Sequence, residues 1–128
     1  MFLKNATAGS NIPQSITGAN FRPSVVLLTS FQDITRATPV AQTRFGIGAS
    51  DGTTEGSAAF IDANGVSPTN TDAIDKTSKV FLKVNNNART INAEADLTSL
   101  DSDGFTLNWT TNDNVATEIG RASCRERV

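Results

Sequence analysis

Two neighbouring segments of the chain alternate between apolar and polar side chains, and this alternation constrains the fold most. Every second residue is apolar in 91–98 and again in 105–110, where the apolar residues are Phe105, Leu107 and Trp109. A period of two residues is typical of a β-strand, whereas a helix would scatter these side chains around its circumference. Residues 101–104, with the sequence Asp-Ser-Asp-Gly, are typical of a turn. The two segments are therefore predicted to form an antiparallel hairpin, with small side chains on one strand facing large ones on the other.

The chain before residue 91 contains further short apolar segments separated by turn residues. The run from Val25 to Leu28 is apolar throughout, so its strand is expected to be central and covered on both faces. Gly46 and Gly48 indicate a bulge or a close approach of another backbone. Residues 67–76 are polar and contain Pro68, so a loop is expected there, with a helical turn at 72–75 as the alternative. A first, weak strand is expected after Pro13 and ends in residues 15–18. Further strands are expected at 24–31, 40–49, 57–62 and 79–84, and turns at 62–65 and 85–87.

These patterns predict the fold class. About seven short strands, few helical patterns and frequent turn residues favour an all-β protein. An antiparallel β-sandwich of jelly-roll or Greek-key type is preferred to a closed barrel. No apolar run reaches the length of a membrane-spanning helix, so no membrane insertion is expected.

The composition excludes several classes of chemistry. The chain has no histidine, no tyrosine and a single cysteine, Cys124. Ser-His-Asp and Cys-His catalytic arrangements, histidine zinc sites and histidine-ligated haem are therefore excluded. The net charge of −2 gives no support for binding a phosphate backbone, so no nucleic-acid partner is expected.

Asp101 and Asp103 are the candidates for a metal site. Their spacing resembles the opening of a calcium-binding loop, but an EF-hand needs a bidentate Glu at its twelfth position, which here is Asn112. A plain turn is favoured, in which the Asp side chains bind local backbone and Gly104 has a left-handed conformation. A calcium site of another kind is the alternative.

Two further acidic residues, Asp96 and Asp113, lie near the same hairpin. Paired carboxylates catalyse glycoside hydrolysis when they flank a cleft. No cleft is indicated, so we expect no catalytic residues, no cofactor and no enzymatic activity. Trp109 is a candidate for stacking on a sugar ring, but it shares a strand face with Phe105 and Leu107, which favours a place in the core.

The last residues differ from the rest of the chain. Residues 119–128 contain three of the eleven basic residues and the only cysteine, but no Thr or Asn. Residues 118–128 resemble the translated read-through of a common short-read sequencing adapter, which in one frame reads Ile-Gly-Arg-Ala-Ser-Cys-Arg-Glu-Arg-Val. A basic C-terminal tail is the alternative. We therefore expect residues 1–117 to form a single, truncated β-sandwich domain that lacks its last strand, and residues 118–128 to be a non-native tail.

Three segments carry a resemblance to a protein family. Residues 16–23 read Ile-Thr-Gly-Ala-Asn-Phe-Arg-Pro, residues 44–49 read Arg-Phe-Gly-Ile-Gly-Ala, and residues 102–110 read Ser-Asp-Gly-Phe-Thr-Leu-Asn-Trp-Thr. Over residues 12–117 the chain resembles a group of small, uncharacterised β-rich proteins from tailed phages, prophages and environmental viral sequences.

This resemblance implies a structural or adhesive protein of the virion or tail, located in the virion. Its expected partners are further copies of itself, with a trimer as one form, or other virion proteins. Residues 51–56 and 62–76 are the expected contact loops. The alternative function is that of a carbohydrate-binding module of a larger protein, with a surface glycan as partner.

Overall fold

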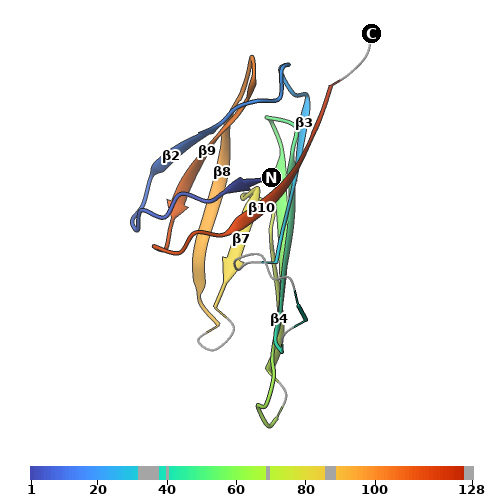
Figure 1. The fold of residues 1–128 in the computed structure, drawn as a ribbon, viewed down its shortest axis with the longest axis vertical. Coiled ribbons are helices and arrows are strands. Elements are labelled where there is room, and N and C mark those ends of the chain that lie inside the picture. Colours follow the sequence, from blue (N-terminus) through green and yellow to red (C-terminus); the bar gives the residue numbers. More distant parts are fainter. Residues whose placement is uncertain (32–37, 40, 69, 86–88, 126–128) are drawn as a thin grey trace.

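The computed structural model describes residues 1–31, 38–39, 41–68, 70–85 and 89–125, and these residues form strands and no helix (Figure 1). The six-stranded sheet has the order β1-β10-β3-β4-β5-β6, and the four-stranded sheet has the order β2-β9-β8-β7. All neighbouring strands are antiparallel, and the two sheets pack face to face. The predicted antiparallel β-sandwich is confirmed. The strands are β1 Phe2–Leu3, β2 Ile12–Ile16, β3 Val25–Ser30, β4 Thr43–Ser50, β5 Glu55–Ala63, β6 Asn70–Lys76, β7 Phe81–Val84, β8 Ile91–Asp101, β9 Gly104–Thr111 and β10 Glu118–Cys124.

The predicted hairpin is formed by β8 and β9. Ala95 lies opposite Trp109, so a small side chain makes room for the largest one, as the alternation predicted. Phe105, Leu107 and Trp109 are fully buried, and the Trp109 ring meets Phe81 edge-on with ring centroids 5.5 Å apart. The prediction that Trp109 belongs to the core is therefore confirmed.

Gly48 on β4 marks a close approach between the two sheets. A Cβ atom at Gly48 would lie 1.9 Å from the carbonyl oxygen of Val80, which directly precedes β7. The close backbone approach predicted from this glycine is confirmed, and no side chain fits at the position. The core on both sides of this contact is apolar, with Val26, Leu28, Val80 and Leu82 almost completely buried.

Two local predictions were wrong. Val25 and Leu27 are 37% and 38% exposed, so β3 is covered on one face only, because a two-layer sandwich leaves the outer face of each sheet open. Residues 70–76 form β6 instead of a loop or helical turn, and they pair with β5 along their whole length. The alternation of β6 is hidden in the sequence because Ile74 is the only large apolar residue in the strand.

The ends of the chain contribute two strands that the sequence did not predict. Residues 118–124, which we expected to be a tail, form β10 between β1 and β3, with Ile119 fully buried. The place beside β3, where we expected the last strand to be missing, is thus filled by residues 118–124. Its resemblance to adapter read-through concerns its origin and stays a prediction.

Of the turns expected at 62–65 and 85–87, the first is formed by Asn64 and Gly65 directly after β5, and Gly65 has a φ of +77°. Most of the other, at 85–87, lies outside the described residues. Within the described part of the chain, no helix is long and apolar enough to cross a membrane.

The close contact at Gly48 gives a first prediction. Gly48→Ala is expected to destabilise the fold by about 1–3 kcal/mol, because the added methyl group forces the two sheets apart. Chemical denaturation followed by tryptophan fluorescence measures the change. Gly56→Ala is the matched control on β5, where the added Cβ would meet the nearest atom, the Lys76 carbonyl oxygen, at an ordinary 3.8 Å. Equal stability losses in the two variants would contradict the prediction.

Candidate functional site

In the structure, Asp101 and Asp103 lie at the β8–β9 turn, and their carboxylates accept hydrogen bonds from protein groups. The Asp101 carboxylate accepts hydrogen bonds from the hydroxyls of Ser99 and Thr106, both at 2.7 Å. The Asp103 carboxylate accepts the backbone N–H groups of Gly18 at 3.1 Å and Asn20 at 2.6 Å, so it binds a distant loop where a local contact was expected. These hydrogen bonds lower the pKa of both carboxyl groups. No cluster of three or more His, Cys, Asp or Glu side chains suited to a metal occurs among the described residues.

The other two acidic residues near the hairpin lie in different surroundings. Asp96 belongs to a surface pocket, where it pairs with Lys79. Asp113 lies in a largely buried position, where it pairs with both Lys4 and Lys83. The structure therefore does not bring together the four carboxylates that are close in sequence.

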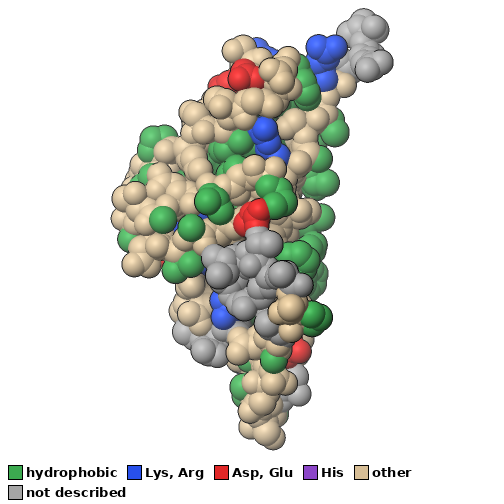
Figure 2. Space-filling model, viewed as in Figure 1, with side chains coloured by type: hydrophobic (Ala, Val, Ile, Leu, Met, Phe, Trp, Pro, Cys, Tyr) green, Lys and Arg blue, Asp and Glu red, His purple; other side chains and the backbone are tan. Residues whose placement is uncertain are grey.

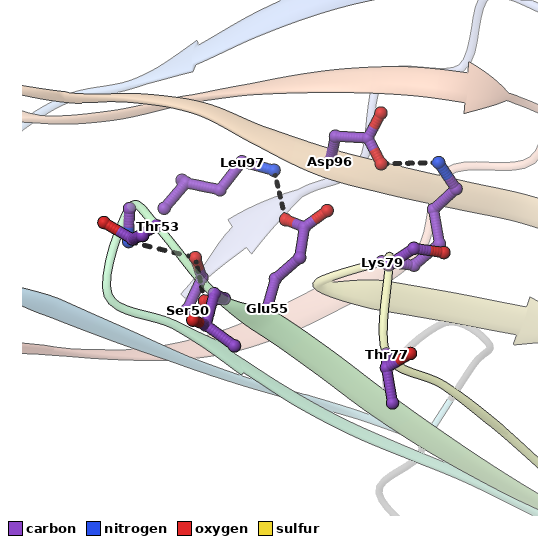
Figure 3. A pocket seen from close by; sticks show the side chains of 10 residues that line it. Ser50, Thr53, Glu55, Thr77, Lys79, Asp96 and Leu97 are labelled. Carbon is purple, nitrogen blue, oxygen red and sulfur yellow. Dashed lines mark hydrogen bonds and ion pairs between the residues drawn. The ribbon is translucent and has the colours of Figure 1, made fainter.

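We call the pocket beside Asp96 the polar pocket; its volume is about 440 Å³. Three segments form its walls: the β4–β5 turn, the connection between β6 and β7, and the middle of β8 (Figure 3). Apart from Gly52 and Leu97, its lining side chains are polar or charged. They are Ser50, Thr53, Thr54, Glu55, Thr77, Ser78, Lys79 and Asp96.

Two carboxyl groups with different partners define the charge in the polar pocket. Asp96 forms an ion pair with Lys79, with 2.5 Å between Oδ1 and Nζ. Glu55 accepts the backbone N–H of Leu97 at 2.9 Å (Figure 3). Burial raises the pKa of Glu55, and the neighbouring negative charge of Asp96 raises it further, against the opposing effects of the Leu97 hydrogen bond and Lys79. The pocket thus offers hydroxyls, one ammonium and two carboxyl groups, which suit a neutral ligand rich in hydroxyl groups better than a metal ion.

Nothing in the sequence links Glu55 to Asp96. They come together because the turn after β4 in one sheet packs over β8 in the other, and turn packing of this kind has no periodic signal. The sequence indicates no cleft beside these acidic residues, whereas the structure has a pocket beside Asp96. Of the expected contact loops, residues 52–55 of the loop 51–56 line the pocket, whereas much of 62–76 is strand β6.

A second candidate surface is the outer face, defined as the side of the six-stranded sheet turned away from the four-stranded sheet. Across its strands, Leu27 lies opposite Ala49 and Phe45 opposite Phe60. In Figure 2, hydrophobic side chains line the right-hand edge of the molecule, where Figure 1 shows this sheet. The exposed fractions of its large apolar side chains are 37% for Val25, 38% for Leu27, 38% for Ile47, 49% for Phe60 and 76% for Phe31, which directly follows β3.

Comparison with protein-family models, curated proteins and solved structures finds no match to this chain.

The environment of Glu55 gives a second prediction. Its carboxyl group is expected to titrate above the usual range for glutamate, because burial and Asp96 disfavour its charged form. A carboxyl ¹³C NMR titration measures this pKa. In Asp96→Asn the pKa of Glu55 is expected to fall, since a negative neighbour is removed while Lys79 stays. The control is Asp62→Asn, on β5 outside the pocket, which is expected to leave the pKa of Glu55 unchanged. A pKa of Glu55 that does not respond to Asp96→Asn would contradict this account.

Proposed function

We propose that this chain is a non-enzymatic structural β-sandwich domain of a phage virion or tail, and that it assembles by packing its outer face against a second copy. The observation that carries the assembly is the exposed apolar surface on β3, β4 and β5. Monomeric soluble proteins rarely leave a large continuous apolar patch in water, and patches of this kind mark interaction sites. The location in a virion is supported by the family resemblance alone.

The size of the outer face fits an interface between two copies. The five strands β10, β3, β4, β5 and β6 at the usual spacing span about 24 Å, and the eight residues of β4 extend about 27 Å, which gives a plane of about 650 Å². The accessible area of a layer of side chains exceeds its plane, so the face approaches the about 800 Å² per partner of a standard interface. Two β-sheets stack face to face at about 10 Å, and a second copy presents the same flat apolar surface.

Packing of the outer face against the same face of a second copy favours a two-fold arrangement, because one patch then serves both copies. The exposed apolar side chains of β3, β4 and β5 then meet those of the partner in the middle of the interface.

Assembly through this face gives a third prediction. The wild-type chain is expected to be a dimer, and Leu27→Glu and Ile47→Glu are each expected to make it monomeric with little loss of fold stability, since both positions face outward. Size-exclusion chromatography with light scattering measures the mass, and thermal melting monitors the fold. Thr98→Glu, on the exposed side of β8, adds the same charge to the other sheet and is expected to remain dimeric.

A wild-type monomer, or a dimer unchanged by both outer-face substitutions, would contradict assembly through this surface. A wild-type trimer would support the form expected from the resemblance and contradict the two-fold arrangement. The virion location has a separate test: the coding sequence should lie beside terminase, portal or tail genes.

The polar pocket favours a second candidate function, that of a carbohydrate-binding module. Its hydroxyl and carboxyl groups can exchange hydrogen bonds with a sugar, but no aromatic side chain lines it, so stacking on a sugar ring contributes nothing there. A fourth prediction follows. Neutral mono- and disaccharides at millimolar concentration should shift the amide NMR signals of Thr53, Thr54 and Leu97, and Glu55→Ala should abolish the shift. Unmoved signals across a broad sugar panel would exclude this function.

A further inference from the structure

A cluster of two lysines and one aspartate is largely buried where the start of the chain meets the end of β9. Lys4 directly follows β1, Asn112 and Asp113 directly follow β9, and Lys83 lies on β7. The side chain of Lys4 is fully buried and that of Lys83 is 3% exposed, although lysine is rarely buried. We call Lys4, Lys83, Asn112 and Asp113 the lysine cluster.

The amine of Lys4 is held against the side-chain amide of Asn112. The distance from Nζ to Oδ1 is 2.6 Å. Because a C=O bond is about 1.23 Å long, the amide carbon Cγ lies at most about 3.8 Å from Nζ. Asn112 Nδ2 donates hydrogen bonds to the carbonyl oxygens of Asn5 at 2.8 Å and Thr7 at 2.7 Å. These two bonds fix the orientation of the amide, since the opposite orientation would place its oxygen against two carbonyl oxygens.

A proton acceptor lies beside the same amine. Asp113 Oδ1 is 2.7 Å from Lys4 Nζ, and Asp113 Oδ2 is 2.8 Å from Lys83 Nζ. Burial raises the pKa of Asp113, but the hydrogen bonds from the two lysines outweigh it and leave the pKa below its usual range. Asp113 is therefore ionised and able to accept a proton.

The charges in the cluster favour loss of one positive charge. Two ammonium groups share one carboxylate, so the cluster has a net charge of +1 in a position largely shielded from water. Burial lowers the pKa of Lys4, and the nearby charge of Lys83 acts in the same direction, while Asp113 opposes both. The neutral amine, which is the nucleophilic form, is thus easier to reach at Lys4 than at a lysine in water.

We propose that Lys4 and Asn112 join in an intramolecular isopeptide bond, with Asp113 as the proton carrier. Asp113 takes a proton from Lys4 Nζ, and the freed electron pair of Nζ forms a bond to Asn112 Cγ, whose C=O electron pair moves onto Oδ1. Asp113 then delivers this proton to Nδ2, and the Cγ–Nδ2 bond breaks as the carbonyl re-forms, which releases ammonia. The new bond leaves Nζ with one proton too many, and the released ammonia takes this proton to become ammonium. An ammonium side chain and a primary amide become a secondary amide and one ammonium ion, and no oxidant or other reactant is needed.

The product carries less net charge in this buried position than the reactants do. Once the released ammonium ion has left, Lys83 and Asp113 remain as a neutral ion pair. Fixed proximity makes a slow amide exchange feasible, because the two groups are held in contact by the fold. The bond would connect residue 4 to residue 112 and so close nearly the whole domain into one loop, which restricts the unfolded chain strongly.

The mass of the purified 128-residue chain tests the proposal directly. The folded wild-type chain, measured fresh and after prolonged incubation, is expected to reach a mass one ammonia below that of its sequence. Trypsin should then fail to cut after Lys4, and residues 1–36 should be recovered joined to residues 90–121, because Pro23 protects the bond after Arg22 and no Lys or Arg lies between 90 and 121. A folded wild-type chain that keeps the full mass would overturn the proposal.

Three variants separate this bond from other losses of ammonia. Lys4→Arg keeps a positive charge but cannot form the amide, and it is expected to keep the full mass. Asp113→Asn is expected to slow the loss, whereas Lys79→Arg, a matched exchange in the polar pocket, is expected to behave as wild type. A succinimide at Asn64-Gly65 also loses ammonia. A wild-type loss of ammonia no larger than that of Lys4→Arg would therefore overturn the proposal, even if the wild-type mass is low.

Discussion

The burial of Trp109 is the constraint to which the rest of the structure is fitted. A buried indole needs a small neighbour and an acceptor for its N–H group. Ala95 lies opposite it on β8, and Gln14 of β2 accepts its N–H at 2.9 Å. The amide of Gln14 in turn donates to the carbonyl oxygen of Leu3 at 2.7 Å, and the ammonium of Lys4 lies 5.6 Å from the ring centroid. One side chain thus determines where β2 and the start of the chain must lie.

The sequence predicts those parts of the fold in which one strand carries its own signal. The β8–β9 hairpin is such a case, because alternation and turn residues occur together, and Gly48 is another, because a missing side chain indicates a close neighbour. Strand β6 was not predicted, because Ile74 is the only large apolar side chain on its inner face and one such residue shows no alternation. The polar pocket and the lysine cluster could not be predicted from the sequence for a different reason. Glu55 meets Asp96, and Lys4 meets Asp113, only after two sheets have packed together.

The two outer surfaces of the sandwich differ in whether their exposed side chains can form hydrogen bonds. On the four-stranded sheet, short polar side chains bind one another across strands, as between the hydroxyls of Ser15 and Thr106 at 3.1 Å. On the six-stranded sheet, the corresponding positions of β3 and β4 hold Leu27 and Ile47, which cannot form such bonds. Water therefore covers the first surface at little cost and the second at a high one. This asymmetry is the physical basis for expecting a partner on one side of the molecule only.

The pairing of β1 with β10 has a mechanical consequence. β1 is two residues long and antiparallel to β10, so a pull on the N-terminal end acts on its few hydrogen bonds in succession, as in the opening of a zipper. After Leu3 the load reaches Lys4, whose ammonium is anchored to Asn112 and Asp113 beyond the end of β9. Lys4 is also held by its backbone N–H, which donates to the carbonyl oxygen of Thr117 at 2.8 Å. Resistance to peeling at this end is therefore concentrated in one residue, whose side chain joins the start of the chain to the segment after β9.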